Sequence, residues 1–350
     1  MVHSLQDLLS QKEIEASAPC RIDAGGTWDI KALALPMERL WPVTVNAALD
    51  LRTFVVLSPY EENRIKVSSH GFPRGKACHV DHIPFEPPFG LFFAALSYFG
   101  FHGLEVRIRS QSPVQSSLGG SSTALVALTK ALVKASVMLG GKKLSIKEIL
   151  HLTYHLEDAV AGGRCGLQDQ AAAAYGGVNL WRWRYGHRTS PFERTPLLDR
   201  GGQKAFSRRL LVAYSGKRHI SSRTNRDWIK GFLSGRTRAG WVKVNEIVHL
   251  LARAIHEQDW AGTADLLREE MTLRKNLTPE ALTPVTVELV RQAEQAGCGA
   301  RFAGAGAGGS IWALGKEENI QRLRKMWEGT LAPVRGAKVL HCQVDPLGVR

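Results

Sequence analysis

The sequence predicts an α+β protein with two domains. The chain has 350 residues, of which 44% are hydrophobic, and this is enough material for two packed cores. Strand-like and helical runs alternate irregularly rather than as strict strand-helix repeats, which is typical of the α+β class. The pattern changes near residue 206. We therefore expect one domain over residues 1–205 and another over residues 206–350.

The first domain is expected to begin with a helix from Ser4 to Ala16, followed by a short strand that breaks at Gly25-Gly26. Prolines mark a loop at 84–88. The other patterns in this region predict strands over 41–49, 51–58 and 104–110, and a buried helix that begins within 91–98.

In the stretch from Pro113 to Leu132, a flexible polar loop runs directly into an apolar helix. Gly119 and Gly120 lack a Cβ, so the backbone can bend there and approach a ligand closely. The residues from Ser121 to Thr123 are natural N-caps for the helix that follows. Such a helix start offers unpaired N–H groups and the positive end of the helix dipole, which together bind phosphate. The alternative is a capped, buried helix after a glycine turn.

Two carboxylates lie on consecutive predicted helices. Glu157 is near the end of a helix that Ser145 caps, and Asp169 opens an alanine-rich helix after a glycine turn. This turn could bring both carboxylates to one cleft. Ordinary surface carboxylates are the alternative, but Asp169 lies between Gln168 and Gln170 beside the alanine run, where we expect burial.

The glycines Gly304, Gly306 and Gly309 satisfy the pattern G-x-G-x-x-G, which raises the possibility of a dinucleotide-binding fold. That fold needs a helix directly after the glycines. Here the run from Ser310 to Leu314 is strand-like. The pattern therefore favours a glycine-rich turn between two strands.

The formal net charge of +14 could indicate nucleic acid, an acidic surface or an anionic substrate. The excess is concentrated between Arg182 and Lys230. In the stretch from Trp181 to Arg188, aromatic residues alternate with arginines, which is also how a half-buried strand looks. We favour a solvated strand face over nucleic-acid binding. Some of these arginines could attract a phosphorylated substrate.

The cysteines and the apolar runs indicate the compartment and the relation to membranes. The five cysteines (Cys20, Cys78, Cys165, Cys298 and Cys342) are scattered and lack C-x-x-C spacing, which suits free thiols in a reducing compartment. The chain has no signal-peptide pattern and no unbroken run of about 18 apolar residues. We expect a cytoplasmic protein that does not interact with membranes. A homodimer is compatible with the sequence.

Three motifs, in order along the chain, resemble those of the GHMP kinases, the superfamily of galactokinase and of homoserine, mevalonate and phosphomevalonate kinases. The first is Arg21, Asp23, Gly25, Gly26 and Asp29. The second is Pro113, Leu118, Gly119, Ser121 and Ser122, with Gln115 and Ser117 where the family usually has glycines. The third is the glycine-rich segment from Gly304 to Gly309, in which Ala307 departs from the family pattern.

Further features look most like the fucokinase and D-glycero-D-manno-heptose 7-phosphate kinase branch. They are Ala24-Gly25-Gly26, the Gln168-Asp169-Gln170 triplet and a Tyr214 to Ser222 segment. The resemblance implies a two-domain GHMP kinase fold: an N-terminal α+β nucleotide-binding domain and a C-terminal ferredoxin-like domain. In the second domain we expect a strand over 209–214, helices over 224–233, 241–257, 260–273 and 316–327, and a last strand over 338–344.

The resemblance also implies phosphoryl transfer from ATP with Mg²⁺. Asp169 would orient or deprotonate the acceptor hydroxyl, and Arg21 would lower the pKa of Asp169 and stabilise the transferring group. Ser122 and Glu157 would hold Mg²⁺. Asp23, Gly25, Gly26, Asp29 and Gln168 would bind the acceptor. ATP would contact Pro113, Ser116, Ser117, Leu118, Gly119, Gly120, Ser121, Ser122, Gly304, Gly306 and Gly308.

The acceptor implied by the branch is a sugar or sugar phosphate that is phosphorylated at its anomeric hydroxyl. Two alternatives stay open at this point. One is a family member that acts on a non-sugar acceptor or as a diphosphate decarboxylase. The other is a protein that binds ATP or nucleic acid without catalysis, although the joint presence of Ser122, Glu157 and Asp169 argues against it.

Overall fold

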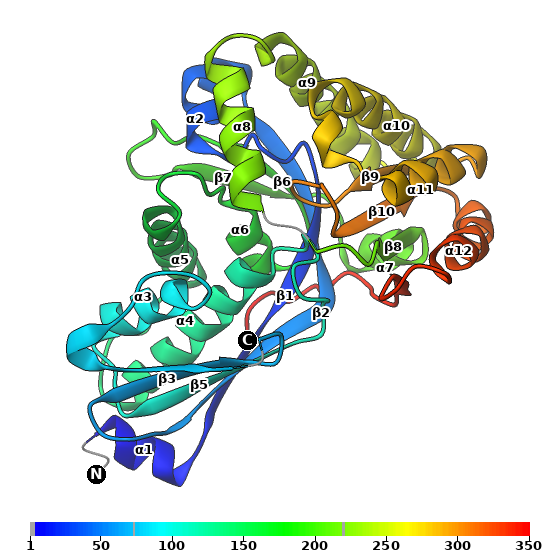
Figure 1. Cartoon of the computed structure of the whole chain (residues 1–350). Helices are drawn as coiled ribbons and strands as arrows, with labels where there is room; N and C mark the ends of the chain where they lie inside the picture. Colours follow the sequence, from blue (N-terminus) through cyan, green and yellow to red (C-terminus); the bar gives the residue numbers. More distant parts are fainter. Residues whose placement is uncertain (1–3, 73, 219–220) are drawn as a thin grey trace.

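The computed structural model describes residues 4–72, 74–218 and 221–350. In these ranges, seven strands of the N-terminal half form one sheet around the long strand β2 (Val43–Pro59) (Figure 1). One edge of β2 pairs with β1 (Ile14–Ala24). The other edge pairs with β6 (Val178–Trp183) near its start and with β5 (Leu104–Ser110) near its end. The outer strands are β3 (Arg64–Ser69), β4 (Lys76–His79) and β7 (Phe192–Pro196).

Strand β2 replaces the two separate strands that the sequence predicts over 41–49 and 51–58. The chain stays extended between them because the C-terminal segment pairs with β2 at this point. The Asp50 N–H donates to the Gln343 carbonyl, and Leu49 forms a bridge with Val344. The segment around Gln343 and Val344 thus occupies the part of this edge of β2 that lies between β6 and β5.

The first helix, α1 (Leu5–Gln11), is shorter than predicted. Ser4 caps it, but Lys12 is already extended, with φ −158° and ψ 128°. The residues from Ile14 onward pair with β2, and all residues of β1 except Glu15 are buried there. Burial in the sheet outweighs helical propensity, which is a weak preference.

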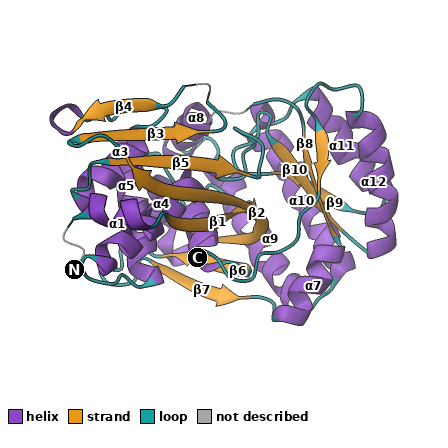
Figure 2. Cartoon of the chain, turned by 90° about the horizontal axis from the view of Figure 1, so that it is seen from below, coloured by secondary structure: helices purple, strands orange, loops and turns teal. Residues whose placement is uncertain are grey.

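Four helices lie on one face of the N-terminal sheet and position the site. They are α3 (Gly90–Phe99), α4 (Gly120–Met138), α5 (Ile146–Val160) and α6 (Gln168–Tyr175). Three of them, α3, α4 and α5, are labelled beside the strands in Figure 2. Helix α4 packs directly against β1 and β2, and both α5 and α6 pack against α4. Short helical segments occur at α2 (Lys31–Ala34), η1 (Leu35–Leu40) and η2 (Val80–His82).

The C-terminal half has a ferredoxin-like sheet in the order β11-β8-β10-β9, and all neighbours are antiparallel. Its strands are β8 (Leu210–Tyr214), β9 (Gly299–Phe302), β10 (Ser310–Leu314) and β11 (Lys338–Leu340). The helices are α7 (Arg200–Arg208), α8 (Ser221–Leu233), α9 (Arg238–His256), α10 (Trp260–Leu277), α11 (Pro284–Gln295) and α12 (Glu317–Leu331), with η3 at Pro279–Ala281. The resulting two-domain α+β fold is the one that the sequence predicts.

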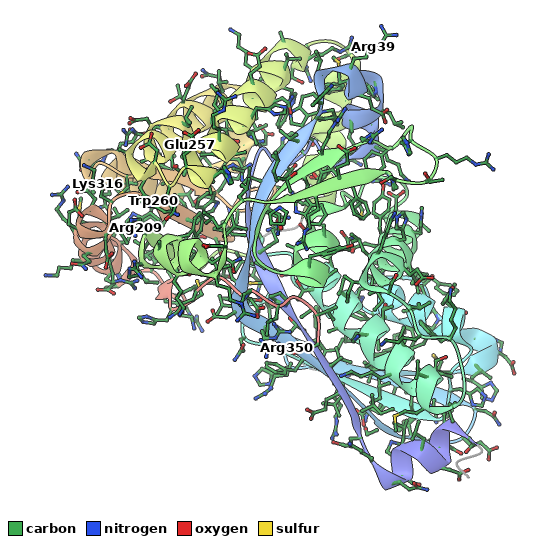
Figure 3. All side chains as sticks on the ribbon, turned by 180° about the vertical axis from the view of Figure 1, so that it is seen from behind. Arg39, Arg209, Glu257, Trp260, Lys316 and Arg350 are labelled. Atoms are coloured by element: carbon green, nitrogen blue, oxygen red, sulfur yellow. The ribbon has the colours of Figure 1, made fainter. Side chains whose placement is uncertain are left out.

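The C-terminal segment returns to the first sheet, as the rear view shows near Arg350 (Figure 3). The Arg52 guanidinium forms a buried ion pair with Asp345 and donates to the Gly348 carbonyl. The Ser17 N–H donates to the Arg350 carbonyl. The chain therefore connects the two halves both before β8 and after β11.

The arginine-rich strand β6 is a half-buried strand, as predicted. Trp181 and Trp183 are fully buried and stack on one face, and Tyr185 continues the stack. On the other face, Arg182 and Arg184 both form ion pairs with Glu193. The alternation thus builds an aromatic face and a partly exposed, paired charged face.

Candidate active site

The N-terminus of α4 has an uncapped first turn. The helix begins at Gly120, its N-cap is Gly119 with φ 78°, and no side chain accepts a hydrogen bond from the first turn. The prediction that the residues from Ser121 to Thr123 act as N-caps is therefore wrong. Gly119 takes the cap position because a left-handed backbone is needed there, and its missing Cβ lets the Asp169 carboxyl approach to about 3.2 Å from the Cβ position. The first N–H groups of α4 remain available to a ligand.

The two departures from the family glycines keep the glycine-like backbone. Gln115 and Ser117 have φ values of 55° and 61°, in the left-handed region that glycine adopts without strain. The Ser117 hydroxyl is also buried without a hydrogen-bond partner in the described part of the chain. The loop thus has backbone angles at these two positions that glutamine and serine adopt only with strain.

The glycine-rich turn between β9 and β10 packs against this loop. The Ser310 N–H donates to the Ser116 carbonyl at 2.8 Å, and a Cβ at Gly304 would lie 3.0 Å from the Ser117 carbonyl oxygen. Gly306 and Gly308 both have positive φ but pack against Ala281 and Lys217 instead. Because strand β10 follows the glycines directly, a dinucleotide-binding fold is excluded here, as the sequence indicates.

Arg21 and Asp169 form the central ion pair of the site. Arg21 Nη2 lies 2.6 Å from Asp169 Oδ1, Nε donates to the same oxygen, and Nη1 donates to the Ser117 carbonyl at 2.6 Å. The Asp169 side chain keeps 25% of its exposed area, so it is half-buried rather than buried as predicted. Burial nevertheless raises the pKa of Asp169, and the opposing effect of Arg21 does not offset it. Arg21 thus lowers the pKa of Asp169, as predicted, but the effect of burial is larger and the net shift is upward.

Asp23 lies on the other side of Arg21 and is fully buried. Its carboxylate pairs with Arg301 at 2.9 Å and accepts a hydrogen bond from the Gly304 N–H at 2.7 Å. Although burial acts in the opposite direction, the charges of Arg301 and Arg21 lower the pKa of Asp23. Asp23 lines neither of the cavities described next; it holds the glycine-rich turn beside β1.

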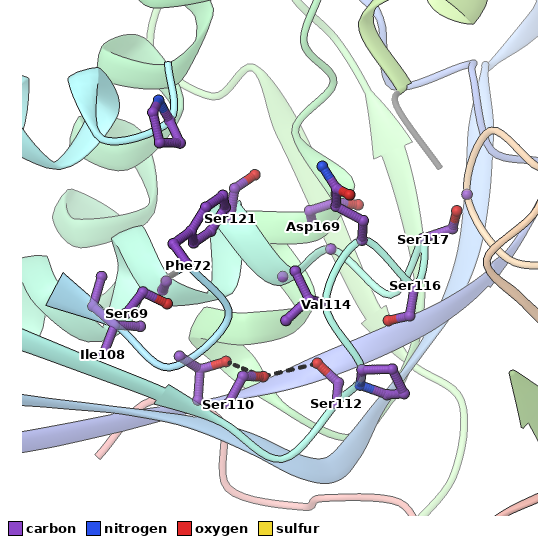
Figure 4. Close-up of a pocket in the computed structure, with 18 of the residues that line it drawn as sticks. Ser69, Phe72, Ile108, Ser110, Ser112, Val114, Ser116, Ser117, Ser121 and Asp169 are labelled. Carbon is purple, nitrogen blue, oxygen red and sulfur yellow. Dashed lines mark hydrogen bonds between the residues drawn. The ribbon is translucent and has the colours of Figure 1, made fainter. Parts of the chain in front are cut away.

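The first cavity, of about 400 Å³, lies over the uncapped end of α4 (Figure 4). One end is polar and includes the loop before α4, Arg21 and Asp169. The other end includes the apolar side chains of Phe72, Phe92 and Ile108, beside the hydroxyl groups of Ser69 and Ser110 (Figure 4). Of the residues predicted to contact ATP, the cavity is lined by Pro113, Ser116, Ser117, Gly119, Gly120, Ser121 and Gly304. Leu118 is buried under the loop, and Gly306 and Gly308 shape the neighbouring turn.

The second cavity, of about 500 Å³, adjoins the first. Both are lined by Arg21, Asp169, Ser121, Gly304, Ala305, Pro87 and Pro88. The second alone is lined by Asp29, Gln168, Ser122 and Glu157, all of which the sequence predicts as site residues. Gly25 and Gly26 do not line it: their missing Cβ atoms make room for Val248 and for the Asp23 carboxylate. The arrangement places the Arg21 and Asp169 pair at the boundary between the two cavities.

Glu157 and the serines of α4 form an oxygen-rich group in the second cavity. Glu157 Oε1 lies 3.4 Å from the Ser121 hydroxyl, and Oε2 accepts a 2.6 Å hydrogen bond from Gln170. Burial raises the pKa of Glu157 to about 7, although hydrogen bonding from Ser122 opposes the shift. Near neutral pH the carboxyl group can therefore change its charge.

Asp29 fixes the start of α6. Its two carboxylate oxygens accept hydrogen bonds from the N–H groups of Thr27 and Gln168, each at 3.1 Å. Burial raises the pKa of Asp29 to about 7, and the nearby Asp169 adds to the shift. Gln168 Oε1, in contrast, is buried without a partner in the described residues, so it can accept a hydrogen bond from a ligand.

Several lining residues were not predicted. The apolar end of the first cavity includes Phe72 and Phe92, and the second cavity includes Thr27, Arg164, Asn225 and Trp228. Thr27 is within the first motif and could have been singled out there. The others come from segments with no motif, and only the fold brings them together. Of the segment from Tyr214 to Ser222, His219 and Ile220 lie outside the described residues.

Comparisons with known proteins identify related sequences and folds. The family models for the GHMP kinase N-terminal and C-terminal domains match residues 90–177 and 251–332. A mevalonate kinase from Pyrococcus horikoshii is 27% identical over 303 residues, which are 81% of this chain and 86% of that protein.

Two solved structures share the fold along almost the whole chain. A D-glycero-D-manno-heptose 1-phosphate kinase from Bacteroides thetaiotaomicron has a TM-score of 0.71 at 18% identity, covering 96% of this chain and 98% of its own. A Lactococcus lactis galactokinase, solved with galactose, has a TM-score of 0.72 at 17% identity, covering 99% and 98%.

The two matched domains define the class: the chain has the N-terminal and C-terminal domains of the GHMP kinases, which are small-molecule kinases. Across the described residues, every helix is too short or too polar to span a bilayer.

Proposed function

We propose that the chain transfers the γ-phosphoryl group of ATP to the anomeric hydroxyl of a sugar or sugar phosphate. The observation that supports this most is the position of Arg21 and Asp169 on the shared wall of the two cavities. ATP would place its adenine at the apolar end near Phe72 and its phosphates over the first turn of α4. The acceptor would occupy the second cavity, and its reacting hydroxyl would meet the phosphates at Asp169.

In this reaction the acceptor oxygen forms a bond to the γ-phosphorus, the bond from that phosphorus to the ADP oxygen breaks, and the hydroxyl proton leaves. Asp169 would accept a hydrogen bond from the hydroxyl and take its proton, and its raised pKa makes it a better base than an ordinary aspartate. Arg21 holds Asp169 in place through two nitrogen atoms and brings positive charge beside the transferring group. In such phosphoryl transfers the positioning of the reactants contributes most of the catalysis, because the transition states are loose.

Mg²⁺ would be held by Glu157 and by the Ser122 hydroxyl, together with the phosphates of ATP. The residues fit this role, since one carboxylate with nearby hydroxyl oxygens is the kind of partial coordination shell that Mg²⁺ shares with nucleotide phosphates. Bound there, the ion would neutralise negative charge on the phosphates. This chain's own contribution is to keep Glu157 facing the first turn of α4, through the hydrogen bond from Gln170.

The polar lining of the second cavity favours a polyhydroxylated acceptor. Asp29, Gln168 and Asn225 offer carboxylate and amide groups, and Gln168 Oε1 has a free acceptor position. A second candidate acceptor is mevalonate, because the curated relative from P. horikoshii is a mevalonate kinase. The apolar side chains of Ile30, Leu91 and Val160 on the same cavity would suit its methyl group.

ADP release from Mg-ATP tests the proposal across fucose, galactose, mannose, heptose 7-phosphate, mevalonate and homoserine. We expect turnover on one of the sugars and its loss in Asp169→Asn. Turnover on mevalonate alone would replace the sugar by the second candidate. No turnover on any acceptor, with ATP still raising the melting temperature, would contradict both.

A further inference from the structure

A third cleft, of about 550 Å³, lies at the joint between the two halves. It shares no lining residue with the two cavities of the candidate active site. Its walls come from β2, α7, β8, α12 and the segment after β11, on the side of the molecule where Arg209, Lys316 and Arg350 are labelled in Figure 3. The lining residues are Asp50, Lys204, Ser207, Arg208, Leu210, Arg324, His341, Cys342 and Gln343.

The charges in this cleft are predominantly positive. The lining includes three cationic side chains, those of Lys204, Arg208 and Arg324, and one carboxylate, that of Asp50. The Asp50 carboxylate already accepts a hydrogen bond from the Gln343 N–H at 2.8 Å. Arg208 has a partial partner outside the cleft, because its Nε lies 3.3 Å from Glu317. No ion pair is found for Lys204 or Arg324 in the part of the chain that the structure describes.

Arg324 is the most informative of these residues. It is half-buried, and its Nη1 atom is enclosed and has no hydrogen-bond partner among the described residues. An enclosed donor without an acceptor is costly, and more so when it belongs to a charged group. The neighbouring Cys342 thiol does not supply a negative charge, because burial raises its pKa to about 12. The Ser207 hydroxyl is already bonded to Gln203 and Val344.

We propose that this cleft binds a phosphate dianion, either free or as the phosphate of a small metabolite. Phosphate oxygens supply the acceptors that Arg324 lacks, and a guanidinium and an ammonium group suit a tetrahedral dianion. A cleft of this volume is large enough for a ligand of metabolite size. Because its walls come from both halves of the chain, bound phosphate would tie α7 and α12 to β2. This site is independent of the proposed kinase activity.

The test uses the full chain with ADP at saturating concentration, so that the nucleotide cavity is filled. The melting temperature is followed against inorganic phosphate, and in a second arm against glycerol 3-phosphate, with sodium chloride at equal ionic strength as the reference. Arg324→Gln and Lys204→Gln remove charge from the cleft. Lys325→Gln, an exposed residue of α12 outside the cleft, is the matched charge control.

We expect the wild type and Lys325→Gln to bind phosphate equally, and Arg324→Gln to bind about tenfold more weakly, as the loss of a charge-assisted hydrogen bond predicts. Lys204 is exposed, so Lys204→Gln keeps the test valid if Arg324→Gln does not fold. Tighter binding of the ester would identify a phosphorylated metabolite, and tighter binding of inorganic phosphate would identify the free ion. Equal phosphate responses in the wild type and both cleft variants, or a response that chloride reproduces, would overturn the proposal.

Discussion

Asp169 and Asp23 lie on opposite sides of the Arg21 guanidinium. Asp169 lines the cavities, whereas Asp23 is buried in the joint between the two sheets. Asp169 keeps 25% of its side-chain exposure, whereas the Asp23 side chain has none. Burial raises the pKa of Asp169, while the charge of Arg301, added to that of Arg21, lowers the pKa of Asp23.

This difference shows that sharing the Arg21 cation does not give the Asp23 and Asp169 carboxylates the same role. Asp23 has a second guanidinium and a backbone N–H as permanent partners, so its charge is fully used inside the protein. Among the described residues, Asp169 has only Arg21 as a charged partner, and it has an open side toward the cavities. Variants of the two aspartates therefore separate a structural from a chemical use of charge.

The largest effect is expected for Asp23→Asn. The change leaves Arg301 with one carboxylate, Glu270, in a fully buried position, and we expect a loss of about 3 kcal/mol in the free energy of unfolding. Because the folded pKa of Asp23 is lowered, its contribution is present above its ordinary value and lost as the pH falls, so the difference should be largest at neutral pH. Urea unfolding of the wild type and of Asp23→Asn at several pH values measures this difference in the free energy of unfolding. Asp227→Asn, on an exposed residue, should change stability little, and an equally small change in Asp23→Asn would contradict the buried pairing.

The opposite pattern is expected for Asp169→Asn. The proposed reaction should slow by about 100-fold or more, because the amide cannot take the proton of the acceptor. ADP binding and the melting temperature should stay close to those of the wild type. Steady-state kinetics with the acceptor that the panel identifies, together with calorimetry of ADP binding, measure both. Near-normal turnover would remove Asp169 from the chemistry.

A third expectation concerns pH and Glu157. Since burial raises the pKa of Glu157 to about 7, the carboxyl group gains a proton as the pH falls through neutrality. The affinity of the nucleotide complex for Mg²⁺ should then fall by up to about tenfold for each pH unit, because the metal needs the ionised ligand. Titrations of Mg²⁺ into the ADP complex at several pH values test this. In Glu157→Gln the affinity should be low and independent of pH; an unchanged pH profile in this variant would assign the titration to another group.

The smallest effect is expected at the phosphate loop. Ser117→Gly should raise the free energy of unfolding by about 1 kcal/mol, because glycine relieves the left-handed backbone and removes a buried hydroxyl without a partner. Ser117→Ala removes only the hydroxyl and should give a smaller gain. Thermal unfolding compares the two. If alanine stabilises as much as glycine, the backbone at this position carries no strain.

Much of the fold could be predicted from local patterns. Glycine turns, helical spacing and strand alternation indicated α3, α5, α6, β5 and β10 and the two-domain α+β class. The errors arose where distant residues decide the local structure. The segment from Gln343 to Asp345 keeps β2 extended, and pairing with β2 ends α1 early. Neither partner is adjacent in the sequence, so no local pattern could show the outcome.

The candidate site was predictable where a motif supplies both residue type and place, as with Arg21, Asp29, Glu157 and Asp169. It was less predictable where burial decides the role. The sequence could not show that Arg301, which lies in no motif, pairs with Asp23, nor that burial outweighs Arg21 at Asp169. The apolar end near Phe72 comes from a segment without a motif, and only the tertiary fold brings it to the phosphate loop.

The return of the C-terminal segment to the first sheet has a topological consequence. The chain passes between the halves once before β8 and again after β11, so each half is attached to the other at two covalent crossings. A single cut in the connection before β8 would leave Arg52 and Asp345 paired and the second crossing intact. The two halves are therefore joined by two covalent connections rather than by a single linker. Any opening between the halves must bend both connections together.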